Sequence, residues 1–261
     1  MKDITVIKIG GSTFGSGDTT FEDVVALQKK KHPLVVVHGG GSTVTDWLKR
    51  QGIATKFVRG ERVTDFPSLA VVTAVLAGLV NKDIVAAINI HGGRAVGISG
   101  VDGSLIESRV KDKEMGYVGS VEKVNKDILE TLLKAGYVPV VSPISLYSLD
   151  RIGDEPGVIN VNGDPIAGEI AVALKAKRLT FLTDVEGIKD KYGKVLPQVS
   201  RAEAEALIES LTIIGGMIPK VNACLKALKA GTIARIIDGR KPHALLKEVE
   251  GGDSGTTIVE G

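Results

Sequence analysis

The chain has 261 residues, of which 43% are hydrophobic and 25% are charged, as is typical of a globular protein with one large domain or two lobes. Its formal net charge is +2 and its longest Lys/Arg run is the three lysines at 29–31, which argues against a nucleic-acid or membrane partner. The single cysteine, Cys224, excludes an intrachain disulfide and a cysteine metal cluster.

Short apolar runs alternate with helical patterns along almost the whole chain. The sequence starts with a strand pattern instead of a secretory leader, and we recognise no apolar run of the roughly 18 residues that a membrane span needs, so we expect a cytoplasmic location. We predict strands at 4–9, 34–38, 94–98, 137–141, 179–183 and 233–237, and helices near 20–31, 42–51, 67–90, 125–135, 164–176, 201–209 and 218–230. This alternation indicates an α/β fold whose mainly parallel open sheet is covered on both faces.

Two further features complete the predicted organisation. Shorter pieces at 54–64, 103–110, 116–118 and 157–162 resemble hairpins at the rim of a sheet, where loops often carry function. A helix closes one half of the chain near residue 176 and a new strand opens the next, which predicts two lobes, 1–177 and 178–261.

Glycine-rich segments adjoin three of these elements. They are Gly10-Gly11-Ser12 after the first strand, Gly39-Gly40-Gly41-Ser42 after the second, and Gly215-Gly216 before the helix at 218–230. Any one of them could be a tight turn, but three such segments favour an anion site built from backbone N–H groups and helix N-termini. Lys8 precedes the glycines that follow the first strand, and the chain has neither GxxxxGK[ST] nor an opening GxGxxG, so a P-loop enzyme and a nicotinamide dehydrogenase fit poorly.

Two lysines lie where local rules disfavour them. Lys8 is in a strand suited to burial, and Lys220 is in the first turn of a helix, the end that repels cations. Such conflicts often mark functional sites. The alternative is that the Lys8 side chain extends outward to solvent and Lys220 pairs with a surface acid.

Other polar residues are candidates for holding these lysines or a substrate. In an extended segment Asn160, Asn162 and Asp164 would share one face, although Asp164 could simply cap the following helix. The guanidinium of Arg62 could bind a carboxylate through two parallel hydrogen bonds, or Arg62 is a surface arginine like the nearby Arg59.

Two residues at strand ends have both a functional and a structural reading. Asp184 follows a late strand at the edge where open α/β sheets bind ligands, or merely ends that strand. His38 precedes the triple glycine, and we interpret it as a structural histidine because no metal-ligand spacing or serine–histidine–acid arrangement is evident among the four histidines.

Six motifs together resemble the amino acid kinase superfamily, and most closely its acetylglutamate kinases of arginine biosynthesis. They are KIGGS at 8–12, VHGGG at 37–41, GERVTD at 60–65, NVNGD at 160–164, LTDVEGI at 182–188 and GGMIPKV at 215–221, and they cover essentially the whole chain in the family's order. The resemblance implies an αβα sandwich, with residues 1–177 binding the acyl amino acid and forming the dimer and 178–261 binding ATP.

The resemblance also implies the roles of individual residues. Lys8 and Lys220 would stabilise the transferring phosphoryl group, and Asp164 would organise them. The acyl substrate, N-acetyl-L-glutamate, would bind at Gly40, Gly41, Arg62 and Asn160. Asn162 would support these residues without touching the substrate. The nucleotide would bind at Gly10, Gly11, Asp184, Gly187 and Gly216. The cofactors implied are ATP and Mg²⁺, with no metal site made by protein residues.

The chemistry of the residues agrees with this resemblance. A γ-carboxylate is already ionised at neutral pH, so its phosphorylation needs no general base, and positioning and charge neutralisation suffice. The main alternative is a relative that phosphorylates aminoadipate or glutamate attached to a carrier protein, and an alternative of another class is a non-catalytic nucleotide-binding regulator. Retention of both lysines and the aspartate argues against the regulator.

The chain departs from the family pattern at three places, of which the first two would affect the acyl pocket. Glu61 stands where a leucine is common, FGSGDTT at 14–20 is an unusual continuation of the first loop, and Gly163 and Pro165 flank Asp164 in place of commoner residues. The chain begins at the first strand, without the extra N-terminal helix of arginine-inhibited hexamers, so the expectation is an arginine-insensitive homodimer that pairs through the apolar helix at 67–90. Nitrogen-signalling proteins bind some relatives, and no sequence feature decides this for the present chain.

Overall fold

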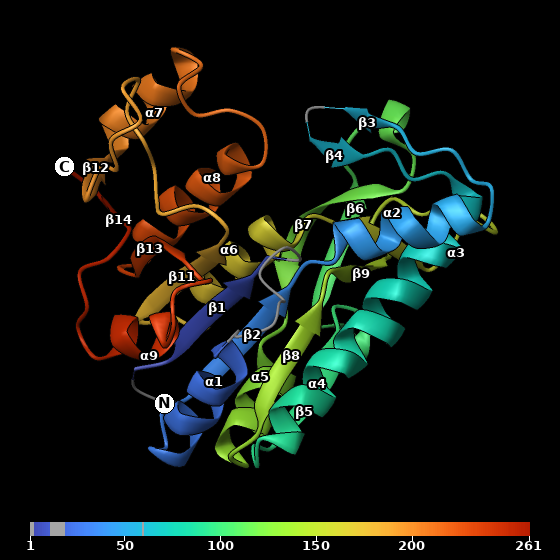
Figure 1. Ribbon diagram of the computed structural model, residues 1–261. Coiled ribbons are helices and arrows are strands. Elements are labelled where there is room, and N and C mark those ends of the chain that lie inside the picture. Colours follow the sequence, from blue (N-terminus) through green and yellow to red (C-terminus); the bar gives the residue numbers. More distant parts are fainter. Residues whose placement is uncertain (1–2, 11–18, 59) are drawn as a thin grey trace.

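The computed structural model describes residues 3–10, 19–58 and 60–261, within which eight strands form one sheet. In spatial order these are β12 (Gln198–Ser200), β14 (Thr256–Val259), β13 (Ile233–Asp238), β11 (Arg178–Thr183), β1 (Thr5–Ile9), β2 (Leu34–His38), β8 (Val138–Ser142) and β5 (Ala95–Ser99). The described pairings are parallel except for the antiparallel pair β13–β14. The sheet is continuous through the molecule, with β12–β14 at one end and β5 toward the other (Figure 1).

Helices cover both faces of this sheet. They are α1 (Thr20–Lys29), α2 (Gly41–Arg50), α3 (Phe66–Thr73), α4 (Asn81–Ile90), α5 (Asp127–Lys134), α6 (Gly163–Ala173), α7 (Arg201–Glu209), α8 (Met217–Leu228) and α9 (Ala244–Val249), with the short 3₁₀ turns Asp102–Ser104 and Lys113–Met115. One core packs α5, α6, α7 and α8 on the sheet, and a second core packs α1, α2, α3, α4 and α9 on the opposite face. The expected three-layer sandwich is therefore confirmed.

Alternation along β1 determines where Lys8 points. Val6 belongs to the core under α6 and α8, whereas Ile7 and Ile9 belong to the core under α1 and α2. Because successive strand residues face opposite sides, Lys8 shares the face of Val6. Its side chain is thus directed to the layer that contains α6 and α8.

The helix predicted at 67–90 forms one continuous helical segment with a π-helical middle, Ala74–Val80, between α3 and α4. By length and composition it is apolar enough to cross a membrane, which differs from the expectation that no apolar run is long enough to do so. A core helix passes the same test, and Val72, Leu76 and Ile84 of this helix are buried in the second core. Its other face exposes Leu79 and the terminal Ile90.

Four further strands close into a small barrel, which the sequence reading did not recognise. These are β6 (Ile106–Val110), β7 (Val118–Val124), β9 (Ile144–Tyr147) and β10 (Val158–Val161). Of the segments predicted as rim hairpins, 103–110, 116–118 and 157–162 overlap β6, β7 and β10, which pair within the barrel, and β9 was missed. The remaining segment, 54–64, contains a hairpin as predicted. Beside the barrel lies the hairpin of β3 (Phe57–Val58) and β4 (Glu61–Arg62), joined to it by a bridge between Thr64 and Gly116.

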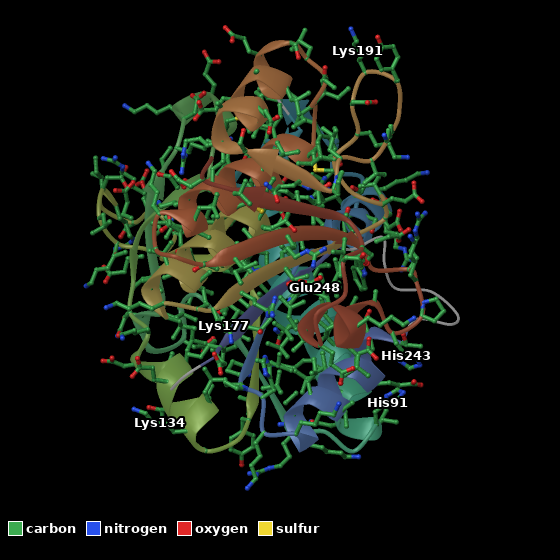
Figure 2. The ribbon with its side chains drawn as sticks, turned by 90° about the vertical axis from the view of Figure 1, so that its left-hand side faces the viewer. His91, Lys134, Lys177, Lys191, His243 and Glu248 are labelled. Atoms are coloured by element: carbon green, nitrogen blue, oxygen red, sulfur yellow. The ribbon has the colours of Figure 1, made fainter. Side chains whose placement is uncertain are left out.

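The last helix, α9, links the C-terminal part of the sheet to α1 at the start of the chain. Asp23 on α1 is buried, and its carboxylate lies 2.7 Å from His243 Nδ1 and accepts the Leu246 N–H at 3.1 Å. Figure 2 labels Glu248 on α9 and His243, which directly precedes this helix. The two predicted lobes are thus in contact through α1 and α9 as well as through the continuous sheet.

Candidate active site

Lys8, Asp164 and Lys220 come together from β1, α6 and α8. Lys8 Nζ lies 2.7 Å from Asp164 Oδ1, and Lys220 Nζ donates to Asp164 Oδ2 at 2.9 Å and to the Gly216 carbonyl at 3.1 Å. Only 4% of the Asp164 side chain is exposed. The structure thus rejects both alternatives: the Lys8 side chain does not extend outward, and the partner of Lys220 is buried.

Two neighbouring cations keep this buried carboxyl group ionised. Burial alone would raise the pKa of Asp164, but the ammonium groups of Lys8 and Lys220 outweigh burial and lower its pKa below the usual value. Asp164 therefore acts as a fixed negative charge that holds two positive charges at one point. Such an arrangement suits a site that must receive anions.

The start of α6 explains why Asp164 is available for these ion pairs. Asn162, not Asp164, is the N-cap, because its Oδ1 accepts the Asp164 N–H at 2.9 Å. Helix α6 begins at Gly163, where a Cβ would lie 3.0 Å from the His38 carbonyl oxygen. Asp164 is therefore helical, as the helix predicted near 164–176 implies, and neither shares an extended segment with Asn160 and Asn162 nor caps the helix.

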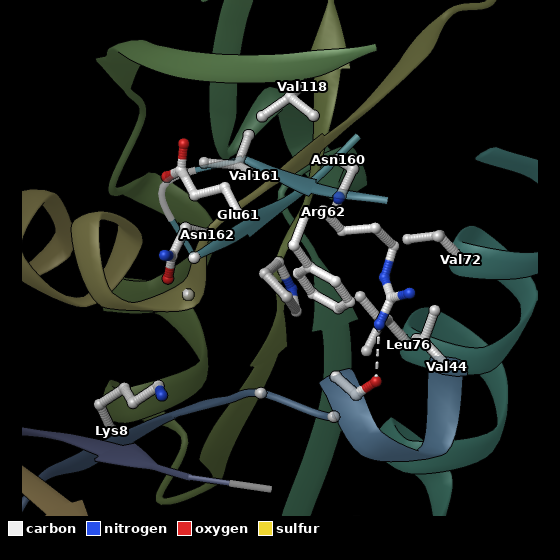
Figure 3. Close-up of a pocket in the computed structure, with 17 residues that line it drawn as sticks. Lys8, Val44, Glu61, Arg62, Val72, Leu76, Val118, Asn160, Val161 and Asn162 are labelled. Atoms are coloured by element: carbon white, nitrogen blue, oxygen red, sulfur yellow. Dashed lines mark hydrogen bonds between the residues drawn. The ribbon is translucent and has the colours of Figure 1, made fainter. Parts of the chain in front are cut away.

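A cavity of about 240 Å³ opens beside Lys8 (Figure 3). The predicted acyl-substrate residues Gly40, Gly41, Arg62 and Asn160 all line it, and apolar side chains such as Leu76 form another part of its wall. The structure therefore brings together this whole group of predicted residues. The mixture of backbone, cationic and apolar groups suits a small, partly apolar anion.

Arg62 is held rigidly at this cavity. Its Nη2 donates to the Gly41 carbonyl at 2.8 Å and to Thr45 Oγ1 at 2.7 Å, and its guanidinium lies 4.7 Å from the centre of the Phe57 ring. Its Nη1 is buried and has no hydrogen-bond partner within the part of the chain that the structure describes. A buried donor of this kind requires an acceptor, which a ligand carboxylate would supply.

Asn160 is fixed from the other side of the cavity. Its Nδ2 donates to Thr64 Oγ1 at 3.1 Å, and Thr64 Oγ1 donates in turn to the Arg62 carbonyl at 3.1 Å. Thr64 is buried and its N–H donates to the Met115 carbonyl. The barrel and the β3–β4 hairpin thus fix Asn160 and Arg62 relative to each other.

A second cavity, of about 750 Å³, lies on the α8 side of the cleft. Its lining includes Lys220, Gly216, Asp164, Glu61 and Lys111. Gly60, Glu61 and Asn162 line both cavities, so the two meet next to the pair of lysines. The cleft therefore has room for one small and one larger ligand on either side of the Lys8–Asp164–Lys220 cluster.

The other predicted nucleotide residues lie apart from these linings. Among the described residues that line the two cavities, Gly10, Asp184 and Gly187 are not included. The Gly10 N–H donates to the Leu182 carbonyl at 3.1 Å, and Asp184 is exposed and accepts from Thr183 Oγ1 at 3.2 Å. At Gly187 (φ 152°) a Cβ would lie 2.7 Å from Thr256 Oγ1, so close packing explains the glycine. Gly11 and the FGSG segment lie outside the described residues.

An ion pair that sequence reasoning missed borders the same cleft. Glu61 Oε2 accepts from Lys111 Nζ at 2.7 Å, which joins β4 to the residue that follows β6. Glu61 was noticed only as a departure from the family pattern. The position of Lys111 after a rim strand gave no signal of this contact, since the pairing of β6 was not predicted.

Comparison with known proteins agrees with this geometry. Residues 3–238 match the model of the Amino acid kinase family. An acetylglutamate kinase from Dehalococcoides mccartyi is 50% identical over 98% of this chain and 94% of its own length. A crystal structure of a Streptococcus mutans protein has a TM-score of 0.86, 29% identity and full coverage of both chains.

A further solved structure that matches this chain contains N-acetyl-glutamate. N-acetylglutamate synthase from Neisseria gonorrhoeae, in complex with coenzyme A and N-acetyl-glutamate, matches with a TM-score of 0.84 and 25% identity over 99% of this chain and 60% of its own. The family model spans most of the chain. The sequence identity to the Dehalococcoides relative is far higher than unrelated proteins show. The chain belongs to the amino acid kinase family and, within it, to the acetylglutamate kinases.

Proposed function

We propose that the protein transfers the γ-phosphoryl group of ATP to the γ-carboxylate of N-acetyl-L-glutamate, giving N-acetyl-L-glutamyl 5-phosphate and ADP in arginine biosynthesis. The observation that carries this proposal is the pair of lysines on one buried carboxylate, Asp164, where a small and a larger cavity meet. The name and coverage of the relatives support the same reaction.

The reaction needs no proton transfer from the protein. A γ-carboxylate oxygen forms a bond to the γ-phosphorus while the bond from that phosphorus to the bridging oxygen breaks, and ADP leaves with the bridging oxygen. The difficulty is to bring two anions together, and cations positioned at the transferring group remove it. Lys8 and Lys220 fill this role, and Asp164 keeps their ammonium groups in place.

The smaller cavity suits the acyl substrate. Arg62 would bind a carboxylate of that substrate with its unpaired Nη1, while Gly40 and Asn160 would contribute polar contacts and Leu76 an apolar one. The larger cavity beside Gly216 suits the nucleotide. We assign acyl-substrate binding to lobe 1–177 and ATP binding to lobe 178–261 on this basis. Gly10, Gly11, Asp184 and Gly187 do not rest on the cavity: the family resemblance implies them, and they would contact parts of the nucleotide that extend beyond it.

Mg²⁺ would enter with the nucleotide. Across the described ranges the structure has no group of three or more His, Cys, Asp or Glu residues that could hold a metal ion. Mg²⁺ commonly keeps several waters and binds through substrate phosphates, where it neutralises charge during transfer. Mg²⁺ would therefore neutralise phosphate charge in addition to Lys8 and Lys220.

The protein would act in the cytoplasm as a homodimer formed by the exposed apolar face of the 66–90 helix. Ala70, Val71, Ala74 and Leu79 line an apolar cavity of about 380 Å³ on this face. A second copy would cover it. Light scattering that gives the mass of a single chain would contradict this assembly.

Substrate identity is tested by measuring ADP release with free N-acetylglutamate, glutamate, aspartate and a carrier-linked acidic substrate side by side. The proposal predicts the highest kcat/KM for N-acetylglutamate. Preference for the carrier-linked substrate would favour an aminoadipate or glutamate kinase. Nucleotide binding without ADP release on any substrate would indicate a regulator.

A further inference from the structure

His38 occupies a position that the proposed reaction does not use directly. It is the last residue of β2, fully buried, and is followed at once by the glycines of the acyl cavity. Its ring nitrogens have two different partners: Nδ1 lies 2.7 Å from the Gly39 carbonyl oxygen, and Nε2 lies 3.2 Å from Asn81 Nδ2. Burial lowers the pKa of His38 to about 4, so the ring is neutral at physiological pH.

The partners assign the tautomer of this neutral ring. A carbonyl oxygen only accepts, so Nδ1 carries the hydrogen and donates to Gly39. Nε2 must then accept from the Asn81 amide. The orientation of that amide is fixed independently, because Asn81 Nδ2 also donates to the Val140 carbonyl at 2.9 Å and Asn81 Oδ1 accepts from Lys82 Nζ at 2.9 Å.

The hydrogen bond from His38 fixes the orientation of one peptide group. In a trans peptide the C=O and the following N–H point in opposite directions, so holding the Gly39 carbonyl also directs the Gly40 N–H. The Gly39 N–H is fixed as well, since it donates to the Ile9 carbonyl at 3.0 Å. Gly40 has φ 148° and lines the acyl cavity, and a Cβ there would lie 2.8 Å from Leu76 Cδ2.

We propose that His38 is a positioning residue: its Nδ1–H holds the Gly39 carbonyl so that the Gly40 N–H is presented to the anionic part of the acyl substrate. This role rests on the proposed function, and it goes beyond the structural histidine that the sequence suggested. A histidine that only satisfies buried polar groups would affect stability. A positioning histidine also affects the KM of one substrate.

Two substitutions separate the two ring nitrogens. In His38→Asn the side-chain amide lies near the position of Nδ1 and can still donate to Gly39, but nothing accepts from Asn81. In His38→Gln the amide reaches the position of Nε2 and can accept from Asn81, but the donor to Gly39 is lost. Each variant loses one of the two hydrogen bonds, so each is the matched control of the other.

The proposal predicts that His38→Gln raises the KM for N-acetylglutamate about tenfold or more, as expected for a weakened hydrogen bond to a charged group, while the KM for ATP stays within about twofold. His38→Asn should keep both KM values within about threefold of the wild type. Equal KM values in the two variants would overturn the proposal. Absence of ADP release from the wild-type protein in the same assay would instead refute the proposed function.

A spectroscopic measurement on the wild-type protein covers the case in which a variant does not fold. With ¹⁵N-labelled histidine, the ring of one of the four histidines should show the Nδ1–H tautomer and no titration between pH 5 and 8. His38→Asn or Asn81→Ala, whichever folds, assigns the signal. An Nε2–H tautomer for His38 would overturn the proposal.

Discussion

Lys8 and Lys220 bind opposite oxygens of the same carboxylate, although one belongs to the first strand and the other to a late helix. Lys8 Nζ lies 2.7 Å from Asp164 Oδ1, and Lys220 Nζ lies 2.9 Å from Asp164 Oδ2. The contact places two positive charges where the two cavities meet. It also joins β1, α6 and α8 at the reacting position, so small movements of α8 would change the site.

Replacing either lysine should mainly reduce turnover. Lys8→Ala and Lys220→Ala each remove one cation from the transferring phosphoryl group, and the expected fall in kcat is about 100-fold or more, with much smaller changes in either KM. Steady-state ADP release measures both quantities. Lys226→Ala, which removes an exposed lysine that pairs with Glu169, is the control and should keep normal turnover. Near-normal kcat in either active-site variant would remove that lysine from the proposed role.

Arg62 should act on binding of the acyl substrate. Arg62→Ala removes the buried, unpaired Nη1 and the support given by Nη2 to Gly41 and Thr45, so the KM for N-acetylglutamate should rise about 10- to 100-fold. Arg62→Lys keeps the charge but loses the planar pair of N–H donors that can bind both oxygens of a carboxylate, so an intermediate KM for N-acetylglutamate is expected. An unchanged KM in Arg62→Ala would exclude Arg62 from the acyl site.

The Glu61–Lys111 pair should hold the β3–β4 hairpin at the edge of the cleft. Half of the Lys111 side chain is exposed, so breaking the pair should change the free energy of unfolding by less than about 1 kcal/mol. Lys111→Met should nevertheless raise the KM for N-acetylglutamate a fewfold, by about two to five times, because β4 also carries Arg62. The exchanged double variant Glu61→Lys/Lys111→Glu should restore part of the loss. If the increase in KM in the double variant equals the combined increases of the two single exchanges, the two side chains do not interact and the pair has no such role.

Sequence reasoning predicted the parts of the fold that depend on local pattern. Strand β2 was predicted with its observed bounds, and Lys8 was recognised because a lysine conflicts with a buried strand. Gly40, Gly41, Arg62 and Asn160 were placed together only through the resemblance, and the structure brings them to one cavity. Their convergence depends on contacts between segments that are distant in the sequence.

The parts that were missed also depend on distant contacts. The barrel requires β9 to pair with β6 and β10, and short strands carry no sequence signal of their partners. Asn162 and Asp164 are both good capping residues, so the start of α6 could not be chosen from propensity alone. The Glu61–Lys111 contact depends on both the hairpin and the barrel.

Glu248 should make stability depend on pH. Glu248 lies on α9 (Figure 2), and its carboxyl group is fully buried. Burial raises its pKa to about 7 even though Arg235 lies 2.9 Å away and Arg178 lies 3.9 Å away. A folded-state pKa above the unfolded value means that this contribution to stability is fully present below about pH 4.5 and is lost as the pH rises to about 7.

The comparison with Glu248→Gln isolates this titration, because other groups with shifted pKa values, such as His38, are present in both proteins. Between pH 5 and 8 the free energy of unfolding of the wild type, measured with urea, should fall relative to the variant by about 1 to 3 kcal/mol. Parallel pH profiles would show that Glu248 does not titrate in this range.

The central claim is the formation of an acyl phosphate on N-acetylglutamate, and product trapping tests it most directly. With ATP, Mg²⁺, N-acetylglutamate and hydroxylamine, the acyl phosphate would react to give phosphate and a γ-hydroxamate that mass spectrometry identifies. The account predicts this hydroxamate in an amount equal to the ADP released, and almost none from Lys8→Ala or Lys220→Ala. ADP release without hydroxamate would contradict the account.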